Sequence, residues 1–419
     1  MIIETIITQH AEEAAFLWLL RDAAVRAPHY SLKDLARLDE RVEAHLDGLR
    51  IAGDAGWAIC ADALKHEESG EVFAAAVPAL EANDPERMQQ VYAAVEAAPE
   101  TARGLISAFG WVSPDRSQDA IHDLLASASA LHRRIGLAAC SVHRMDPAGL
   151  LQAALDDEDP ALRARALRAA GELGRTDLLP HLLRRVRDED AACRFRAAWS
   201  ALLLGDRGDA LESLKAMAGS DSPFREKALQ LALRAMDGAR ARDWLKGLAQ
   251  YPDWLRYVVL GAGIAGDPAY IPWLMEQMET PELARPAGES FSMITGVDLA
   301  YEDLDGEWPE GFEAGPTENP EDQDVALDPD EDLPMPDPGR VRAWWQANKD
   351  RFQLGTRYLA GRTISVENCR QILRTGLQRQ RNGAALELAL LQPGAPLFET
   401  RAPGFRQEQV LQATAQDGS

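Results

Sequence analysis

A short segment recurs at a fixed interval of 31 residues in the middle of this chain. "DEDPALRARALRAAGELG" occupies residues 157–174, and "DEDAACRFRAAWSALLLG" occupies residues 188–205. A period of 20–50 residues is typical of arrays in which each repeat is one supersecondary unit. The residues that keep this interval are Arg163, Arg194, Arg225 and Arg256, with Asp159, Asp190 and Asp221, and with Gly174 and Gly205.

Each repeat is expected to form a hairpin of two helices. Leucines and alanines recur at i, i+3, i+4 and i+7, which is the apolar stripe of an amphipathic helix. Asp159 suits the N-cap, Pro160 the first helical position and Gly174 the end of the helix. One hairpin cannot bury its apolar face, whereas a stack of hairpins can. The sequence therefore predicts an all-α fold, an α-solenoid over residues 70–285.

Regions of different composition flank the array. Residues 1–69 are expected to form an N-terminal helical region in which Ser31 caps a helix. Residues 286–339 contain no Lys or Arg, and 302–337 hold fifteen Asp and Glu, so we expect an acidic, proline-rich loop that is mobile. Residues 340–419 are expected to form a basic helical region, with twelve Lys and Arg against four acidic residues between 340 and 406.

Overall charge argues against nucleic acid and anionic membranes as partners. The 419 residues carry a formal net charge of −23, which repels phosphate backbones and anionic lipids. The four cysteines, Cys60, Cys140, Cys193 and Cys369, lie far apart, as free thiols of a reducing compartment do. Neither a secretory signal nor an apolar run long enough to cross a membrane is visible, so we expect a soluble, cytoplasmic protein.

Two resemblances support this prediction. The segment "DPALRARALRAAGELG" resembles the HEAT-like repeats of phycobilin lyases. The N-terminal "LARLDERVEAHLDGLRIAGDAGW" and the C-terminal "RYLAGRTISVENCRQILRTGLQRQRNGAALELALLQPGAPLFETRAPGFRQ" are similar to a bacterial family of HEAT-repeat proteins encoded beside type VI secretion genes. That resemblance implies association with secretion effectors or their loading, and it implies no catalytic residues.

Motifs that could carry chemistry are weak. "VVLGAGIAG" at 258–266 matches the glycine pattern of dinucleotide sites, but Arg256 places it in phase with a repeat helix. His66–Glu67 is the one adjacent His-Glu pair, too few ligands for a di-iron centre, and the remaining histidines are scattered. We therefore expect no catalytic residues, no metal and no cofactor.

The arginines at constant phase are the main candidates for partner binding. Arg163, Arg194, Arg225 and Arg256 would lie on one face of the stack, about one in each layer. They could pair with N-cap aspartates and form a ladder that fixes the stacking angle, which is the interpretation we favour. Alternatively they form a groove for a partner's carboxylates, which arginine forks suit. Arg103 and Arg134 keep the same interval in weaker upstream repeats.

The C-terminal region supplies further candidates, Trp344, Arg379 and Arg381. In "RAWWQ" we favour burial of both tryptophans, with Trp344 as a contact anchor in the alternative, since tryptophan is enriched in binding hot spots. The acidic loop is either a solvated linker or a cover that blocks the basic C-terminal helices until a partner arrives.

These features favour a non-enzymatic scaffold that binds a protein. By resemblance, that partner is a type VI secretion effector, its adaptor or a tip component. An immunity protein that neutralises a cognate toxin is the alternative within binding functions. A lyase-like or hydroxylase-like enzyme that uses the HEAT groove is the alternative from another class.

Overall fold

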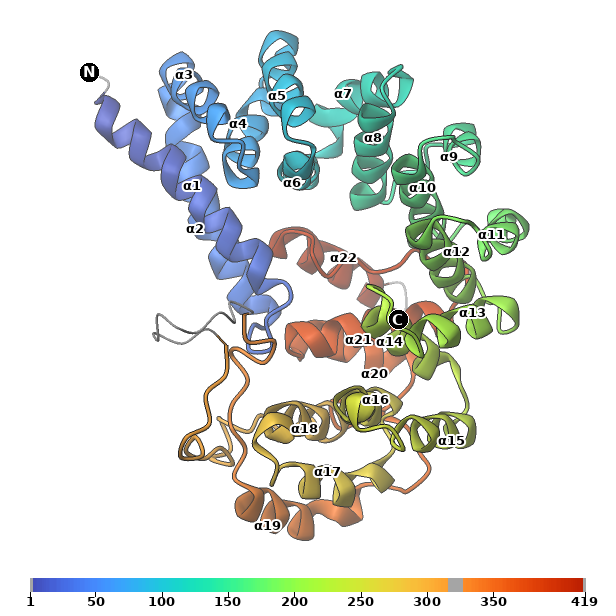
Figure 1. Ribbon diagram of the computed structural model, residues 1–419. Helices are drawn as coiled ribbons and strands as arrows, with labels where there is room; N and C mark the ends of the chain where they lie inside the picture. The colour runs from blue at the N-terminus through green and yellow to red at the C-terminus, as the bar shows by residue number, and fades with distance from the viewer. Residues whose placement is uncertain (1–2, 316–326, 417–419) are drawn as a thin grey trace. The chain divides into compact units, whose positions relative to one another are not determined.

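A computed structural model describes residues 3–315 and 327–416, and it is built almost entirely of helices (Figure 1). The predicted all-α solenoid is confirmed. The chain divides into an N-terminal unit, Met1–Ala210 with Gln392–Ser419, and a second unit, Leu211–Leu391. This division differs from the four segments expected from composition, because the last residues of the chain pack with the part that ends at Ala210.

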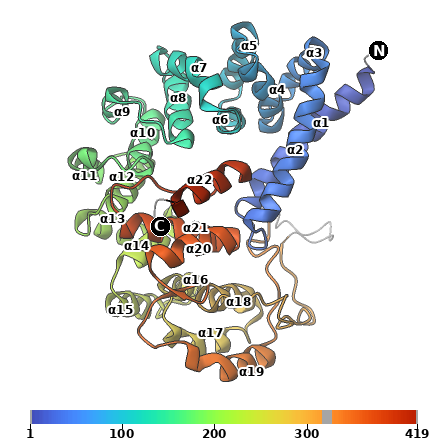
Figure 2. The same cartoon turned by 180° about the vertical axis from the view of Figure 1, so that it is seen from behind.

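The N-terminal unit is an arc of paired helices, with α22 on its inner side (Figures 1 and 2). Its inner layer consists of α4, α6, α8, α10 and α12, each packed on the next. The helices are α1 (Glu4–Ala24), α2 (Leu32–Ala52), α3 (Asp54–Ala63), α4 (Ser69–Glu81), α5 (Pro85–Ala97), α6 (Ala102–Trp111), α7 (Pro114–Ala126), α8 (Ala130–His143), α9 (Gly149–Ala154), α10 (Pro160–Glu172), α11 (Leu179–Arg185), α12 (Ala191–Leu203) and α22 (Gly404–Gln416).

The predicted helix ends are confirmed in these repeats. Asp159 accepts a hydrogen bond from the Leu162 backbone N–H at 2.8 Å, and Asp190 accepts one from Cys193 at 2.8 Å. Gly174 ends its helix at φ +70°, a conformation that costs glycine little. Asp221 is the exception, because α14 begins four residues later and Asp221 stays exposed.

Small residues let neighbouring inner helices approach closely. The Ser200 hydroxyl of α12 donates to the Leu167 carbonyl of α10 at 2.7 Å. A Cβ atom at Gly171 would lie 2.5 Å from the Ser200 Oγ atom, so only glycine fits there. Alanines and leucines fill the space between these helices, with Leu167 and Ala198 fully buried. Stacking therefore builds the core that one hairpin could not.

The second unit continues the helix pairs and ends with a short hairpin and two further helices. Its elements are α13 (Asp209–Ala218, which begins two residues before the boundary), α14 (Arg225–Ala235), α15 (Gly238–Leu248), α16 (Leu255–Ala265), α17 (Ile271–Gln277), α18 (Pro281–Thr295), α19 (Pro338–Asn348), β1 (Tyr358–Leu359), β2 (Arg362–Thr363), α20 (Val366–Thr375) and α21 (Gln378–Leu391). The two strands are antiparallel.

The glycine motif at 258–266 is helical, as expected. It lies on α16, which ends at Gly266 with φ +75°. Gly263 contacts Ser290 of α18 so closely that a Cβ atom would lie 2.8 Å from the Ser290 Cα atom. These glycines therefore serve close packing of helices.

The expected end of the array at Pro286 is wrong. Helix α18 passes through Pro286 and continues to Thr295. The prediction of a mobile acidic loop is also wrong for the parts that the structure describes, since Leu299, Leu304 and Leu333 are buried. Residues 316–326 lie outside the described ranges. The average composition of the segment is acidic, but apolar side chains spaced along it are buried and hold it in place.

No helix in the described part of the chain is long and apolar enough to cross a membrane. The four cysteines are free and buried.

Candidate anion-binding surface

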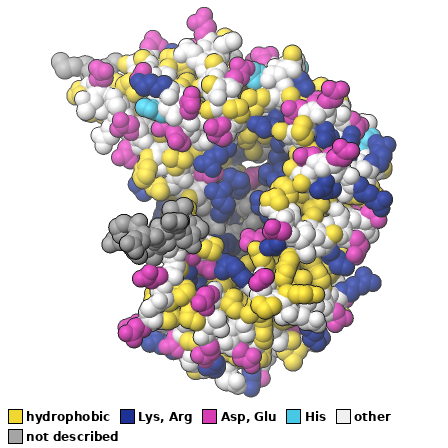
Figure 3. Space-filling model, viewed as in Figure 1, with side chains coloured by type: hydrophobic (Ala, Val, Ile, Leu, Met, Phe, Trp, Pro, Cys, Tyr) yellow, Lys and Arg dark blue, Asp and Glu magenta, His cyan; other side chains and the backbone are white. Residues whose placement is uncertain are grey.

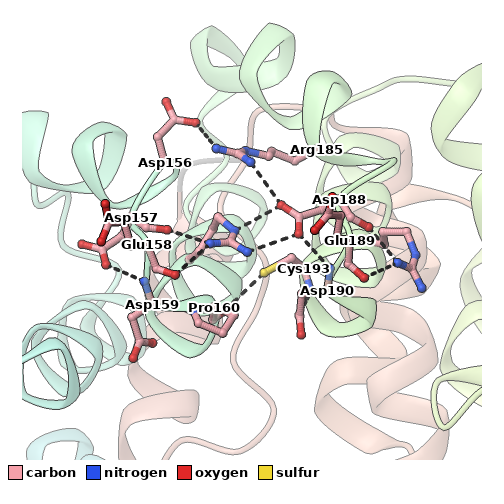
Figure 4. Close-up of polar contacts among 12 residues, drawn as sticks. Asp156, Asp157, Glu158, Asp159, Pro160, Arg185, Asp188, Glu189, Asp190 and Cys193 are labelled. Carbon is pink, nitrogen blue, oxygen red and sulfur yellow. Dashed lines mark hydrogen bonds and ion pairs between the residues drawn. The ribbon is translucent and has the colours of Figure 1, made fainter.

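Arg163 and Arg194 hold the loops that precede the inner helices. Figure 4 labels the residues that accept their hydrogen bonds, among them Asp157, Asp188 and Glu189. Arg163 Nε and Nη2 lie 3.1 and 3.2 Å from the Asp188 carboxylate, and Arg163 Nη1 donates to the Asp157 carbonyl at 2.7 Å. Arg194 Nη1 donates to the carbonyls of Asp188 and Glu189, each at 2.7 Å. The expected ladder partner was an N-cap aspartate, whereas Asp188 lies two residues before the N-cap Asp190. These arginines are structural, and Arg194 has no carboxylate partner among the described residues.

Arg225 and Arg256 of the second unit use different partners. The Arg225 guanidinium lies 4.5 Å from the Trp254 ring centroid and donates to the Tyr257 hydroxyl at 3.1 Å. Arg256 forms two hydrogen bonds of 2.6 Å to the carboxylate of Asp330, in the acidic segment. Arg225 Nε also donates at 2.7 Å to the carbonyl of the residue five positions earlier, and Arg163 and Arg194 donate to the equivalent carbonyls. Three of the four arginines of the predicted row therefore share a contact with the preceding loop, and Arg256 pairs with a distant carboxylate instead.

Of the C-terminal candidates, Arg381 is misplaced as a partner contact. Its side chain is completely buried and donates to the Leu373 carbonyl at 2.7 Å. Burial lowers the pKa of Arg381 to about 10. Arg379, about one third exposed, forms an ion pair of 2.7 Å with Glu289. Trp344 is partly buried and packs edge-on against Phe291, with ring centroids 5.6 Å apart.

A second arginine row lies on the inner helices of the N-terminal unit, and sequence reasoning did not separate it from the first. Its members are 31 residues apart: Arg103 on α6, Arg134 on α8, Arg165 on α10 and Arg196 on α12. Arg165 and Arg196 follow Arg163 and Arg194 by two residues, which is about 200° around a helix. The spacing of 31 residues between Arg103 and Arg134 is the feature of the sequence that indicates this inner row, and these two arginines belong to it and not to the row of Arg163 and Arg194.

Two members of the inner row have hydrogen-bond or ion-pair partners and two do not, within the ranges that the structure describes. Arg103 pairs with Asp22 at 3.0 Å, and Arg165 forms an ion pair with the buried Glu172 and donates to Ser141 at 2.7 Å. Arg134 and Arg196, both partly buried, form no hydrogen bond or ion pair within residues 3–315 and 327–416. The inner row therefore has guanidinium donors that no described residue uses.

The segment 392–406, which we call the belt, crosses the inner side of this unit. The Leu397 N–H donates to the Glu172 carbonyl at 3.0 Å, and Arg144 Nε donates to the Leu397 carbonyl at 2.7 Å. At the far end, the Gly404 N–H donates to the Asp39 carboxylate at 2.6 Å. The belt thus connects α10 and α8 with α2.

The belt adds two more arginines to the same surface. Arg401 pairs with Asp22 at 2.9 Å, and Arg406 donates to the Val142 carbonyl at 3.0 Å. Between the belt and the inner helices lies a cavity of about 360 Å³, where Figure 3 shows Lys and Arg side chains gathered around a hollow. Its charged lining consists of Arg21, Arg103, Arg134, Arg165, Arg168, Arg401 and Arg406, with Asp22, Glu100, Glu172 and Glu399.

The cavity is positive although the protein is strongly acidic. Seven arginines against four carboxylates leave a formal surplus of three positive charges. Burial alone would raise the pKa of Glu172, but Arg165 and Arg168 outweigh it and hold that pKa well below its usual range. Nearby, burial first and the charge of Arg168 second lower the pKa of Arg196 to about 9. The lining of the cavity therefore carries more positive charge than its four carboxylates neutralise.

The acidic segment of the second unit shows how this chain binds carboxylates with arginine. Arg285 is 4% exposed and forms two hydrogen bonds to Asp328, of 2.6 and 3.0 Å. It also donates to the Asp330 carbonyl at 2.8 Å. The segment therefore covers arginines of α16 and α18, which does not fit a solvated linker. It also contacts the first helix of the basic C-terminal region, since Arg340 Nη1 donates to the carbonyls of Asp303 and Asp305 at 3.1 and 3.0 Å.

Comparison with known proteins supports the repeat architecture. Residues 147–234 match the family model of HEAT repeats. No curated protein matches the chain. HEAT repeats commonly mediate protein–protein interaction, so the chain has the architecture of an interaction scaffold.

Proposed function

We propose that this protein is a non-enzymatic scaffold that holds an acidic segment of a protein partner against the inner arginine row. The observation that carries the proposal is a pair of guanidinium groups, Arg134 and Arg196, whose hydrogen-bond donors no described residue accepts and which lie on the concave side of a repeat stack. Solenoids present extended concave surfaces to partners. Arginine forks match carboxylate geometry, and a net charge of −23 disfavours nucleic acid.

The identity of the partner rests on resemblance alone. The terminal segments are similar to HEAT-repeat proteins encoded beside type VI secretion genes, so we propose a secretion effector, its adaptor or a tip component as the partner. This role places the protein in the cytoplasm of a bacterium, where free cysteines such as those of this chain stay reduced.

The test compares partner capture by matched variants in the native host. The double variant Arg134→Glu/Arg196→Glu reverses two charges without removing a hydrogen bond or ion pair within the described residues, although it removes the stacking of Arg196 on Phe195 at 5.1 Å. Arg37→Glu, at a side chain that is 66% exposed on α2, is the control. We expect quantitative mass spectrometry to show an acidic protein that co-purifies with the wild type and the control but not with the double variant.

Retention of every co-purifying protein by the double variant would contradict the proposal. All three proteins must melt at the same temperature for the comparison to count. Elemental analysis of the purified protein tests the hydroxylase alternative, because a hydroxylase of this architecture would retain iron.

A further inference from the structure

We propose that the cavity between the belt and the inner helices is a binding site for a phosphoryl group. The inference goes beyond the proposed function, since the site would bind such an anion with no protein partner present. It rests on unsatisfied donors, on charge and on size.

Buried guanidinium groups in the cavity lining have donors without acceptors in the described part of the chain. Arg21 is 4% exposed, and its Nε donates to Asp39 at 2.8 Å. The Nη2 atom of Arg21 is buried and has no hydrogen-bond partner among the residues that the structure describes, and the same holds for Arg165 Nε. Leaving a buried charged donor unpaired is costly, so these atoms favour a bound acceptor.

The charge of the lining favours a dianion over a single carboxylate. Four carboxylates already occupy the surface, and three positive charges remain. Arg134 contributes one of them, and no described residue pairs with it. A carboxylate would neutralise one charge through two oxygens, whereas a phosphoryl group offers three oxygens that arginine forks can bind from several directions. The surplus therefore matches a phosphoryl group.

The size of the cavity limits the ligand. A volume of about 360 Å³ falls within the range of small-molecule sites, about 300–1,000 Å³. Ala402 and Pro403 of the belt close one side. A folded domain cannot enter, so the phosphoryl group arrives either on a small soluble molecule or on one phosphorylated side chain.

Titration with inorganic pyrophosphate tests the site directly. Calorimetry at constant ionic strength compares the wild type with Arg134→Gln, which removes an arginine without stranding a described partner, and with Arg37→Gln as the surface control. We expect binding to the wild type and the control, and a dissociation constant at least about tenfold weaker for Arg134→Gln, equal to about 1.4 kcal/mol. Arg134→Lys, which keeps the charge but loses the fork, should fall between them.

Equal pyrophosphate affinity of the wild type and Arg134→Gln, or no binding to the wild type, overturns the proposal. Citrate binding more tightly than pyrophosphate also overturns the phosphoryl assignment. A phosphoserine peptide and its unphosphorylated form separate the two sources. Pyrophosphate binding alone assigns the site to a soluble anion, and added binding of the phosphopeptide, lost in Arg134→Gln, assigns it to a phosphorylated protein. These titrations use no natural partner, so their outcome is independent of the capture experiment.

Discussion

Arg163→Ala is expected to destabilise the N-terminal unit more than Arg194→Ala, although the two arginines occupy equivalent positions in successive repeats. Arg163 forms an ion pair with Asp188, whose side chain is 3% exposed. Arg194 donates to two backbone carbonyls, which water can partly reach after the substitution. Only the first change leaves a buried carboxylate without one of its cations.

The contacts that remain set the size of each effect. Removing one partner of a buried ion pair costs about 3–5 kcal/mol. Asp188 keeps Arg185 at 3.2 Å and the Asp190 N–H at 3.0 Å, so we expect a loss of about 2–3 kcal/mol in the free energy of unfolding. For Arg194→Ala, we expect a loss of about 1–1.5 kcal/mol in the free energy of unfolding, because water can replace part of its two hydrogen bonds to carbonyls.

Thermal and urea unfolding followed by circular dichroism measure both effects. For a unit of this size, 1 kcal/mol shifts the melting temperature by about 2–4 °C, so Arg163→Ala should lower it by about 4–12 °C. The double variant Arg163→Ala/Asp188→Asn should recover part of that loss, because the stranded charge is gone. An Arg194→Ala variant at least as unstable as Arg163→Ala, or a double variant without recovery, would refute the reasoning.

Three further changes test other parts of the structure. Gly174→Ala should cost about 1–3 kcal/mol in unfolding free energy, because φ is +70° and the new Cβ would lie 2.2 Å from the Gly394 carbonyl oxygen; urea unfolding measures this loss. Burial and Arg406 lower the pKa of His143 to about 4, so the unfolded chain binds more protons than the folded one between pH 4 and 6.5. The free energy of unfolding should therefore fall as the pH drops through this window, by at most about 1.4 kcal/mol per pH unit. In His143→Gln the melting temperature should depend less on pH within this window. Asp328→Ala removes the carboxylate partner of the buried Arg285 and should speed proteolysis within residues 327–337, which limited digestion detects.

Local patterns were enough to predict the repeats. An N-cap such as Asp159 acts on N–H groups within three residues, and a glycine at positive φ acts at its own position, so both can be read from a short segment. The same holds for Ser31, whose predicted role as a helix cap is confirmed; the structure adds a capping box with Asp34. The helical interpretation of the glycine motif at 258–266 succeeded because Arg256 fixed its phase.

Long-range contacts could not be predicted in the same way. The Gly404 N–H meets Asp39 across 365 residues, and no periodicity relates the two positions. The acidic segment misled because its average composition hides Leu304 and Leu333, which are buried. Arg381 was wrongly predicted as a partner contact for a similar reason, because the basic composition of its region does not show that this arginine is completely buried.

The inner row shows how a correct period can still give the wrong surface. Arg163 and Arg165 both keep the repeat interval with their counterparts in the next repeat, yet they point to different sides of one helix. The predicted row contains the arginines nearest the N-caps, and two of them, Arg163 and Arg194, hold the loops that precede the helices. Only the three-dimensional arrangement identifies Arg134 and Arg196 as the members whose donors no described residue uses.

The discontinuous N-terminal unit has a consequence for synthesis on the ribosome. Its larger part, which ends at Ala210, is made before the second unit, Leu211–Leu391, and the belt follows only afterwards. At about 5–20 residues per second, the inner arginines wait about 10–40 s for the belt. During that interval the nascent arc exposes a positively charged surface with one side open. A partner or an anion present during translation would therefore meet this surface before the belt covers one side of it.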